Sequence, residues 1–466
     1  MAKPNSIIIE NFGNMRPDLP TFSAKNTMYS ASGVNPVYYL DDNTKQEEII
    51  LPLAASVAMT TTFVNTTGTI TDIISVQGTT PYAIADVNGN IINGTATRTS
   101  VFSAGTVLLS SFGNYIIASS SASVNIAYAG IFSSTFNTVV GTGVSGPYYM
   151  TPFLNFLAVG SQNLVYNVPI SGFPANVPGT PALTLSAGYN IIGKPEVYGN
   201  YLSIPYAPST ISFVNNYLAL WNGILPLPSY NILLPGKFVG QVCIAGTLYI
   251  VIEERTGIQT LGYLKQYSYI RKRTLHGTFS TTANKTKAVF NARGYVGINT
   301  DAGLYLYKAD EGLGEIAYLH DTNNYSVVIS SSNGINDAYD LYGVIGNTVY
   351  TTNGSTNYNP IAYKSQFAQV TPYRLKVWYN TPPQSSTDAI YTTLLGIDEY
   401  DPTGNIVNET ATLNTITSTS FDNYKYTILD CQGFTGDKMS ISLTTVNTSS
   451  WRPVIKRIEI VPQLDN

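Results

Sequence analysis

The sequence has few charged side chains. Charged residues make up 11% of its 466 residues, less than half of the roughly 25% typical of soluble domains. Ser, Thr, Asn and Tyr supply the polarity instead, and Tyr alone occurs 35 times. The formal net charge of −4 argues against tight, sequence-independent nucleic-acid binding, which needs clustered Lys and Arg. A surface that hydrates through hydroxyls and amides is more typical of extracellular proteins than of cytosolic enzymes.

Cysteine and histidine are also scarce. Cys243 and Cys431 lie far apart in the sequence, so neither a disulfide framework nor a cysteine zinc site is expected. We expect both to be small buried side chains. The two histidines, His276 and His320, have no paired-His metal spacing, and no serine lies in a G-x-S-x-G turn. The sequence therefore predicts no catalytic residues, no metal site, no cofactor and no enzyme.

Long apolar runs are absent. No stretch approaches 18 apolar residues without interruption, so no transmembrane helix or stable membrane insertion is expected. The run Ile7, Ile8 and Ile9 is too short for a signal-peptide core. A surface of extracellular type without a secretion signal is the pattern expected of particles released by cell lysis.

Two further motifs predict loops. "GTGVSG" (141–146) matches G-x-G-x-x-G, but "PYYMTPF" follows it where a helix would be required. Two acidic groups could in principle hydrolyse a glycoside, but both fall in predicted turns, where acidic residues are usually solvated. They are Asp310, Glu311 and Glu315, and Asp398, Glu399 and Asp401.

Short alternating or continuous apolar runs, separated by Gly, Pro, Asn and Ser, predict an all-β chain. One strand recurs as "GNYIIA", "LNFLAV", "GNYLSI", "GTLYIV", "RGYVGI" and "GNTVYT". A second strand follows each copy and ends on an aromatic residue, from Tyr128 to Tyr363. The positions that mark the first strands are Gly113, Leu154, Gly199, Gly246, Arg293 and Gly346, with a poorer copy at residue 78.

This recurrence predicts a β-propeller, because the copies are separated by roughly the 40–50 residues of a four-stranded blade. Any all-β chain shows regular turn-strand patterns, but here two strand types recur in phase. With the poorer copy there are about seven blades, and six or eight remain open.

The repeat stops after Tyr363, and Pro372 is a reasonable boundary. We expect a propeller over residues 46–370 and an independent jelly-roll-like β-sandwich over 371–466. The last strand (453–462) is expected to lie beside the strand at 373–380.

Residues 1–45 fit neither unit. Ile7, Ile8, Ile9 and Phe12 are predicted to form an extended assembly arm that could add a strand to a neighbouring subunit. A tail without fixed structure remains open.

One cluster is basic: Lys265, Arg271, Lys272 and Arg273, interleaved with Tyr267 and Tyr269. Such alternation can engage single-stranded nucleic acid. An ion cluster with Glu253 and Glu254 is the interpretation that we favour, with transient contact with passing DNA as the alternative.

The lead-in "IIIENFGN", the propeller without an enzymatic site and the length resemble the tail nozzle, or tail stabilisation, proteins of short-tailed bacteriophages. The resemblance covers the architecture of most of the chain and rests on no sharp motif. The sandwich departs from the simplest members and suggests a module that docks fibres or neighbouring tail proteins.

The resemblance implies a structural protein of the virion tail. It implies a homo-oligomer, a hexameric ring beneath the portal and adaptor through which the genome leaves. An alternative is a receptor-binding or carbohydrate-binding protein of a tail or cell surface. A glycan hydrolase on a propeller is the least favoured.

Overall fold

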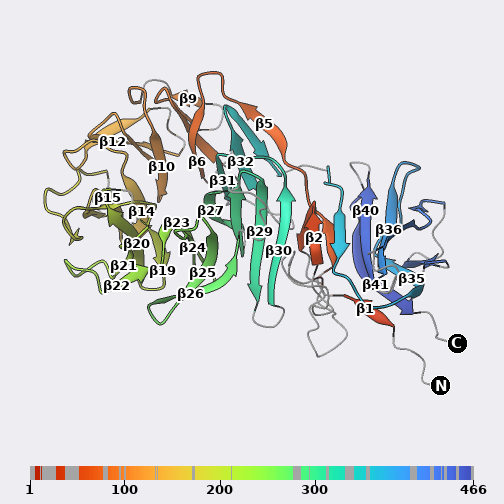
Figure 1. Ribbon diagram of the computed structural model, residues 1–466. Coiled ribbons are helices and arrows are strands. Elements are labelled where there is room, and N and C mark those ends of the chain that lie inside the picture. Colours follow the sequence, from red (N-terminus) through yellow and green to blue (C-terminus); the bar gives the residue numbers. More distant parts are fainter. Residues whose placement is uncertain are drawn as a thin grey trace, which may run out of the picture. The chain divides into compact units, whose positions relative to one another are not determined.

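The chain forms β-strands and connecting segments throughout the part that the computed structural model describes (Figure 1). It divides into two compact units, which we call the propeller unit (59–302 and 324–353) and the sandwich unit (1–58, 303–323 and 354–466). No helix of the described residues is long and apolar enough to cross a membrane. The described residues are 6–10, 12, 28–36, 52–76, 82–93, 96–98, 101–131, 133, 135–169, 174–210, 213–275, 285–292, 294–310, 314–330, 341–352, 357–398, 407–419, 425–431, 433–434, 438–447 and 451–462.

The propeller unit begins with four antiparallel sheets, each made of consecutive strands. The first three have four strands, and the fourth has a split first strand, since β18 and β19 both pair with β20. The strands are β6 (Ile70–Ser75), β7 (Tyr82–Asp86), β8 (Ile91–Asn93), β9 (Ala96–Arg98); β10 (Val107–Phe112), β11 (Tyr115–Ser120), β12 (Asn125–Gly130), β13 (Asn137–Val140); β14 (Tyr149–Phe153), β15 (Phe156–Ser161), β16 (Leu164–Pro169), β17 (Leu183–Thr184); and β18 (Tyr189–Ile191), β19 (Glu196–Tyr198), β20 (Tyr201–Pro208), β21 (Asn216–Trp221), β22 (Tyr230–Leu234).

Three further blade positions follow. They are the sheet of β23 (Lys237–Ile244), β24 (Thr247–Glu253), β25 (Gln259–Lys265) and β26 (Ser268–Thr274); the hairpin of β27 (Thr286–Ala292) and β28 (Tyr295–Thr300); and the sheet of β31 (Val327–Ser330), β32 (Leu341–Ile345), β33 (Thr348–Thr351) and β5 (Thr60–Val64).

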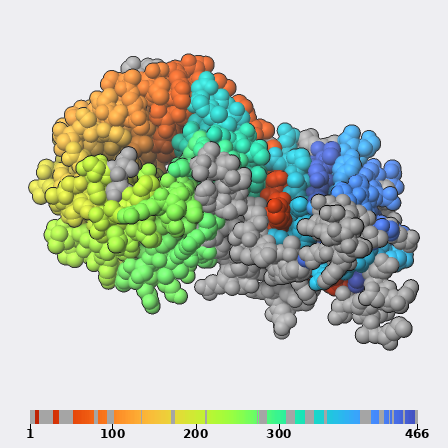
Figure 2. Space-filling model, viewed as in Figure 1, coloured from red at the N-terminus to blue at the C-terminus, as the bar shows by residue number. Residues whose placement is uncertain are grey.

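Each blade contacts the next through its inner strands, and β31 contacts β6, so the described residues close a ring of seven blades. Figure 2 shows successive blades from orange through yellow to green around this unit. The prediction of a propeller with about seven blades is therefore confirmed. The ring is closed by a strand from the beginning of the chain: β5 pairs with β33 in a register that places Thr60 opposite Thr351 and Val64 opposite Thr348.

Four of the recurring sequence positions, Gly113, Leu154, Gly199 and Gly246, mark the turn between the first two strands of a blade, whereas Gly346 lies between β32 and β33, the second and third strands of the last blade. Gly113, Leu154, Gly199, Gly246 and Gly346 all have positive φ, between 52° and 80°. This conformation favours glycine, which explains why the motif recurs. Arg293 lies outside the described residues, but the adjacent Gly294 has φ 92°.

The aromatic end of the second repeated strand recurs less regularly. Tyr128, Tyr166 and Tyr263 lie in the third strands of their blades. Phe213 lies between strands, and Tyr363 lies in β34 (Ala362–Ser365) of the sandwich unit. Sequence alone misplaced this last strand because its apolar pattern resembles that of a blade strand.

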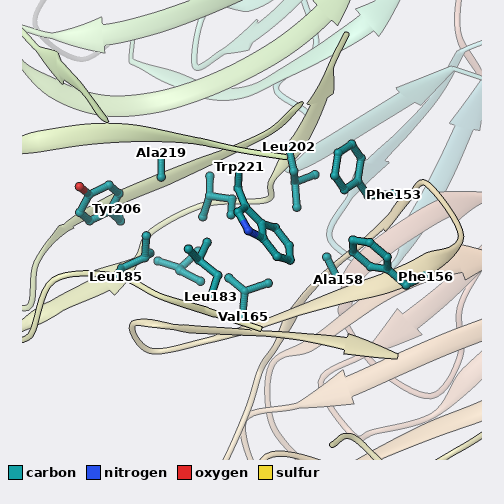
Figure 3. Packing of buried hydrophobic residues seen from close by; sticks show 12 residues of the cluster. Phe153, Phe156, Ala158, Val165, Leu183, Leu185, Leu202, Tyr206, Ala219 and Trp221 are labelled. Atoms are coloured by element: carbon teal, nitrogen blue, oxygen red, sulfur yellow. The ribbon is translucent and has the colours of Figure 1, made fainter. Parts of the chain in front are cut away.

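Adjacent blades are held by apolar side chains from facing sheets. Trp221 of β21 is fully buried and lies beside Phe156 of β15, with 5.8 Å between ring centroids. Leu183, Leu202 and Ala158 complete the packing around its ring (Figure 3). A buried aromatic side chain of this size contributes several kcal/mol to folding.

The sandwich unit has two sheets with alternating buried side chains. One contains β3 (Val34–Pro36), β4 (Leu53–Ala55), β41 (Val454–Pro462), β35 (Pro372–Tyr379) and β39 (Tyr426–Asp430), with β1 (Ile7–Ile9) also on β41. The other contains, in this unit, β29 (Gly303–Asp310), β30 (Gly314–Asp321), β2 (Met28–Ser32), β34, β40 (Lys438–Val446), β36 (Ala389–Asp398) and β37 (Val407–Thr412), with β38 (Ile416–Thr417) on β36. The expected pairing of the last strand with β35 is present.

The two units do not have the boundaries expected from the sequence. The sandwich unit takes residues from the beginning, the middle and the end of the chain. Hydrogen bonding explains the difference, since β2 pairs with β34 and β34 pairs with β40. A compositional boundary at residue 370 cannot show these long-range pairings.

Candidate functional site

A cavity of about 530 Å³ lies on the axis of the propeller. The first strands of the blades line it, and most of its wall is apolar. Its charged residues are Asp72, Lys194 and Glu196. The volume lies within the range of small-molecule pockets, so the function of these charged groups decides what the cavity can do.

Asp72 ties the first blade to the second. Its Oδ1 accepts a hydrogen bond from the N–H of Ile73 at 2.8 Å, and its Oδ2 accepts one from the N–H of Leu109 in β10 at 2.7 Å. Burial raises the pKa of the Asp72 carboxyl to about 6, although these two bonds and Lys194 act in the opposite direction. Both oxygens are therefore engaged by the backbone.

Glu196 and Gln241 tie the fourth blade to the fifth. Oε1 of Glu196 accepts a hydrogen bond from the N–H of Cys243 at 3.2 Å. Burial raises the pKa of Glu196, and the bond from Cys243 and the charge of Lys194 oppose that shift. The buried Gln241 donates to the carbonyls of Lys194 and Ser203 and accepts from the Ser203 hydroxyl at 2.8 Å. These side chains hold strands together, and none is arranged as an acid–base pair.

Similar ties recur at other junctions between blades. The N–H of Tyr148 donates to Oγ of Ser119 at 2.9 Å. Single buried polar side chains also bind the backbone of the next blade in three further pairs: Asn216 with Phe238, Gln259 with Thr286, and Asn299 with Tyr325. Since buried polar groups are costly unless hydrogen-bonded, each tie favours one arrangement of neighbouring blades.

An exposed apolar patch lies on turns of the third and fourth blades. It consists of Leu154, Ile224, Leu225 and Leu227, and we call it the apolar turn patch. Ile224 is 81% exposed and Leu227 is 65% exposed. The two turns are adjacent, because a Cβ added to Gly223 would lie 3.2 Å from Leu154. Contiguous apolar surface of this kind marks an interaction site more often than a scattered side chain does.

The predicted assembly arm pairs within its own chain. Ile7, Ile8 and Ile9 lie opposite Ile460, Glu459 and Ile458 of β41. Phe12 is buried, and its ring meets that of Tyr363 edge-on at 5.3 Å. Addition of this strand to a neighbouring subunit stays a prediction, and the structure shows that β41 is the edge it fits.

The predicted basic cluster lies at the end of β25 and at a bulge in β26. Arg271 is opposite Gly262 and Arg273 is opposite Leu261, so Lys272 is the extra residue of the bulge. Lys272 lies over the ring of Tyr263 at 5.4 Å, and Lys265 is exposed at the end of β25. The side chain of Arg273 is not among those that the structure describes. The expected partner Glu253 instead binds Lys285 at 2.8 Å.

The interleaved tyrosines of that cluster have other partners. Tyr267 stacks on Tyr230 of the neighbouring blade, with 3.8 Å between ring centroids. The hydroxyl of Tyr269 lies 3.1 Å from that of Thr260. The alternation of basic and aromatic residues therefore does not form one continuous surface for a nucleic-acid strand.

The remaining chemistry-bearing residues are dispersed. Among the described residues, no three His, Cys, Asp or Glu side chains lie close enough to hold a metal ion. Burial raises the pKa of the Cys431 thiol to about 12 and also raises that of Cys243. His320 is buried, and burial lowers its pKa to about 4. Glu311, Glu399, Asp401 and His276 lie outside the described residues.

Sequence reasoning missed the axial ties and the apolar turn patch. A signal for the ties was present, since Asp72 and Gln241 interrupt apolar strands ("ITDIISV" and "GQVCI"). For the patch, "NGILPLP" (222–228) places three aliphatic residues among turn formers. Sequence alone does not tell whether such residues are buried.

Comparison with known proteins assigns the chain to no family. No family model matches, and no curated protein sequence matches. Among solved structures, the Cps50 (Swd1) β-propeller domain of Myceliophteria thermophila is 12% identical, covering 63% of this chain and 99% of that one, with a TM-score of 0.44. The RRP9 WD40 repeats are 12% identical, covering 64% and 98%, with a TM-score of 0.44. YCF48 from Cyanidioschyzon merolae is 10% identical, covering 64% and 98%, also at 0.44.

Proposed function

We infer that this chain is a structural subunit of a virion tail, of the nozzle or stabilisation type found in short-tailed bacteriophages. Copies would form a ring, hexameric in the form that the resemblance suggests, which extends the portal and adaptor channel and lets the genome exit. The apolar turn patch carries this proposal, because a ring subunit needs a surface for its neighbour.

The axial cavity supports a scaffold in preference to an enzyme. The carboxylate of Asp72 is engaged by the backbone through both oxygens, and that of Glu196 through one. A cavity of about 530 Å³ accepts a small molecule, not a duplex. In the proposed assembly, the genome passes along the axis of the ring of subunits and not through each propeller.

The net charge agrees with this function. A channel that lets DNA slide should not hold it, and non-specific affinity comes mainly from Lys and Arg that neutralise phosphates. With 24 basic and 28 acidic residues, the subunit gives little general attraction for DNA. Contact with the passing genome would be transient, and no cofactor is required.

The test is assembly of the full chain. Native mass spectrometry and negative-stain microscopy, without and with portal and adaptor proteins, should show rings. The variant Ile224→Asp with Leu227→Asp should reduce assembly at least tenfold, because each change places a charge in the apolar turn patch. Val140→Asp is the matched control, since Val140 is 56% exposed on another blade. A monomer under every condition, or equal assembly of the patch variant, would contradict the proposal.

A further inference from the structure

A group of tyrosines meets where the fourth blade contacts the fifth. Tyr198 and Tyr201 lie opposite each other in β19 and β20, beside the turn at Gly199. Tyr230 begins β22, and Tyr267 lies in the turn between β25 and β26. Figure 1 shows β22 and β26, which contact each other, at the lower edge of the propeller unit. We call Tyr198, Tyr201, Tyr230 and Tyr267 the tyrosine cluster.

The rings of the tyrosine cluster are in contact with one another. Tyr267 and Tyr230 are stacked, with an angle of 14° between their planes. Tyr201 meets Tyr230 edge-on, with 5.8 Å between ring centroids. Tyr201 also packs against the buried core between these two blades, which includes Leu220 and Leu264. The blade junction therefore holds the rings in place before any ligand arrives.

Part of the cluster remains open to solvent. Tyr267 is 47% exposed and Tyr230 is 37% exposed. The stack covers one face of the Tyr267 ring, so its exposed surface lies on the other face and along its edges. A bound molecule can reach this surface without moving a side chain.

Tyr267 has a backbone conformation that is unusual for a large residue. Gln266 and Tyr267 have φ of 48° and 63°, as in the two-residue hairpin turns for which Asn-Gly is the preferred pair. The equivalent turn between β23 and β24 has a glycine in the second position, Gly246. A bulky residue with positive φ is strained, and such strain gathers at functional sites. Since glycine fits this turn better, the turn itself does not require the ring of Tyr267.

The hydroxyl groups of the cluster also lie near one another. A side-chain hydrogen bond with Tyr230 raises the pKa of Tyr267, and the hydroxyls of Tyr201 and Tyr198 raise it further. Every side chain that shifts this pKa is a tyrosine of the cluster. A tyrosine hydroxyl both donates and accepts hydrogen bonds, so the cluster combines an apolar ring face with uncharged polar groups.

We propose that the tyrosine cluster binds a neutral polysaccharide. The C–H face of a sugar ring packs on the open face of Tyr267, and sugar hydroxyls exchange hydrogen bonds with the tyrosine hydroxyls. An aromatic side chain with a polar tip suits a ligand of this kind. A proline-rich peptide also docks on aromatic side chains, but prolines only accept hydrogen bonds, so the hydroxyl groups favour the sugar. The site goes beyond ring assembly and does not depend on it.

Affinity electrophoresis of the full chain tests the site. Native gels contain laminarin, galactomannan or dextran as neutral polysaccharides. We expect retardation by at least one of the three. Tyr267→Gly removes the ring and relieves the strain in the turn, and Tyr267→Asn does so with another residue that tolerates positive φ. Each should lower the affinity about tenfold, which corresponds to about 1.4 kcal/mol.

Tyr391→Thr is the matched control, because it removes a tyrosine that is 42% exposed in the sandwich unit. It should retain the affinity of the unsubstituted chain. Urea unfolding should show that Tyr267→Gly is as stable as the unsubstituted chain, so that its loss of binding does not reflect a loss of fold.

A labelled polyproline peptide, followed by fluorescence anisotropy, is the competing ligand. Retardation by none of the neutral polysaccharides, unchanged affinity of both Tyr267 variants, an equal loss in Tyr391→Thr, or binding of the peptide alone would overturn the proposal. The Tyr267 variants leave the apolar turn patch unchanged and ring formation is measured separately, so the two outcomes can be distinguished.

Discussion

The axial cavity of the propeller and the outer face of the β35 sheet, which is formed by the outward residues of β41, β35 and β39, use polar side chains in opposite ways. In the cavity, both oxygens of Asp72 and one of Glu196 accept hydrogen bonds from the backbone. On the sandwich face, Arg457 and Trp378 each retain an N–H without an acceptor. A charged group in a concave site is therefore not by itself a sign of function here, and the N–H groups without an acceptor are buried atoms of the sandwich sheet.

The largest effect that we expect is the loss of stability when a buried tryptophan of the propeller is removed, compared with removal of a tryptophan from the outer face of the β35 sheet. Trp221→Ala should destabilise the propeller unit by about 4 kcal/mol, because it leaves a cavity among fully packed neighbours. Trp378→Ala should cost only about 1 kcal/mol, since it removes a cation–π and aromatic contact on an outer face. Urea unfolding followed by circular dichroism measures both. Equal losses would show that the outer face is packed as firmly as the propeller core.

Acid should destabilise the sandwich unit through His320, so the dependence of stability on pH distinguishes the two units. Its folded pKa of about 4 lies below the ordinary value of 6.5. For a base with a lowered pKa, the stabilising contribution is present above pH 6.5 and is lost as the pH falls toward 4. Relative to His320→Gln, the unsubstituted chain should lose about 3 kcal/mol across this window. Parallel pH profiles of the two proteins would contradict the shift.

Asp72 in the propeller should show the opposite dependence on pH. Its folded pKa of about 6 lies above the ordinary value of 3.8, so its contribution to stability is present below pH 3.8 and is lost as the pH rises through 6. Asp72→Asn, which lacks this titration, is the reference at each pH. At pH 7, Asp72→Ala should cost about 2 kcal/mol, because two backbone N–H groups lose their acceptor. A chemical unfolding series at pH 4, 5, 6 and 7 tests both expectations.

The smallest effect is expected at the predicted basic cluster. Lys272→Gln removes a cation over the ring of Tyr263, and partly exposed contacts of this type contribute about 0.5–1 kcal/mol at most. The unfolding midpoint should therefore barely move. A loss above 2 kcal/mol would show that this cluster holds the blade together and is not a surface feature.

Sequence alone predicted the propeller because its turns leave a local signal. Positive φ favours glycine at the turn between the first two strands of several blades, as at Gly113 and Gly199. The strands of the sandwich between 373 and 462 were also predictable, because their apolar alternation is local. Neither inference required contacts between distant residues.

Long-range pairings could not be predicted in this way. Nothing near Thr60 indicates that it lies opposite Thr351, and nothing near Ile7 indicates Ile460 as its neighbour. The candidate sites depend on the same information. The hydrogen bond that Leu109 donates to the Asp72 carboxylate, and the contacts of Tyr426 and Arg457 with Trp378, exist only because strands distant in sequence become adjacent, so composition and spacing do not show them.

The pairing of β5 with β33 has a consequence for synthesis on the ribosome. The last blade cannot be completed until residue 351 has left the exit tunnel, and β1 waits longer still for β41, near residue 460. Until then, β5 and the isoleucines of β1 are strands without their final neighbours. A stalled or truncated product lacking β41 should therefore contain a complete propeller but expose the apolar strand β1. Premature termination would then favour aggregation, and β1 is paired only once β41 has been made.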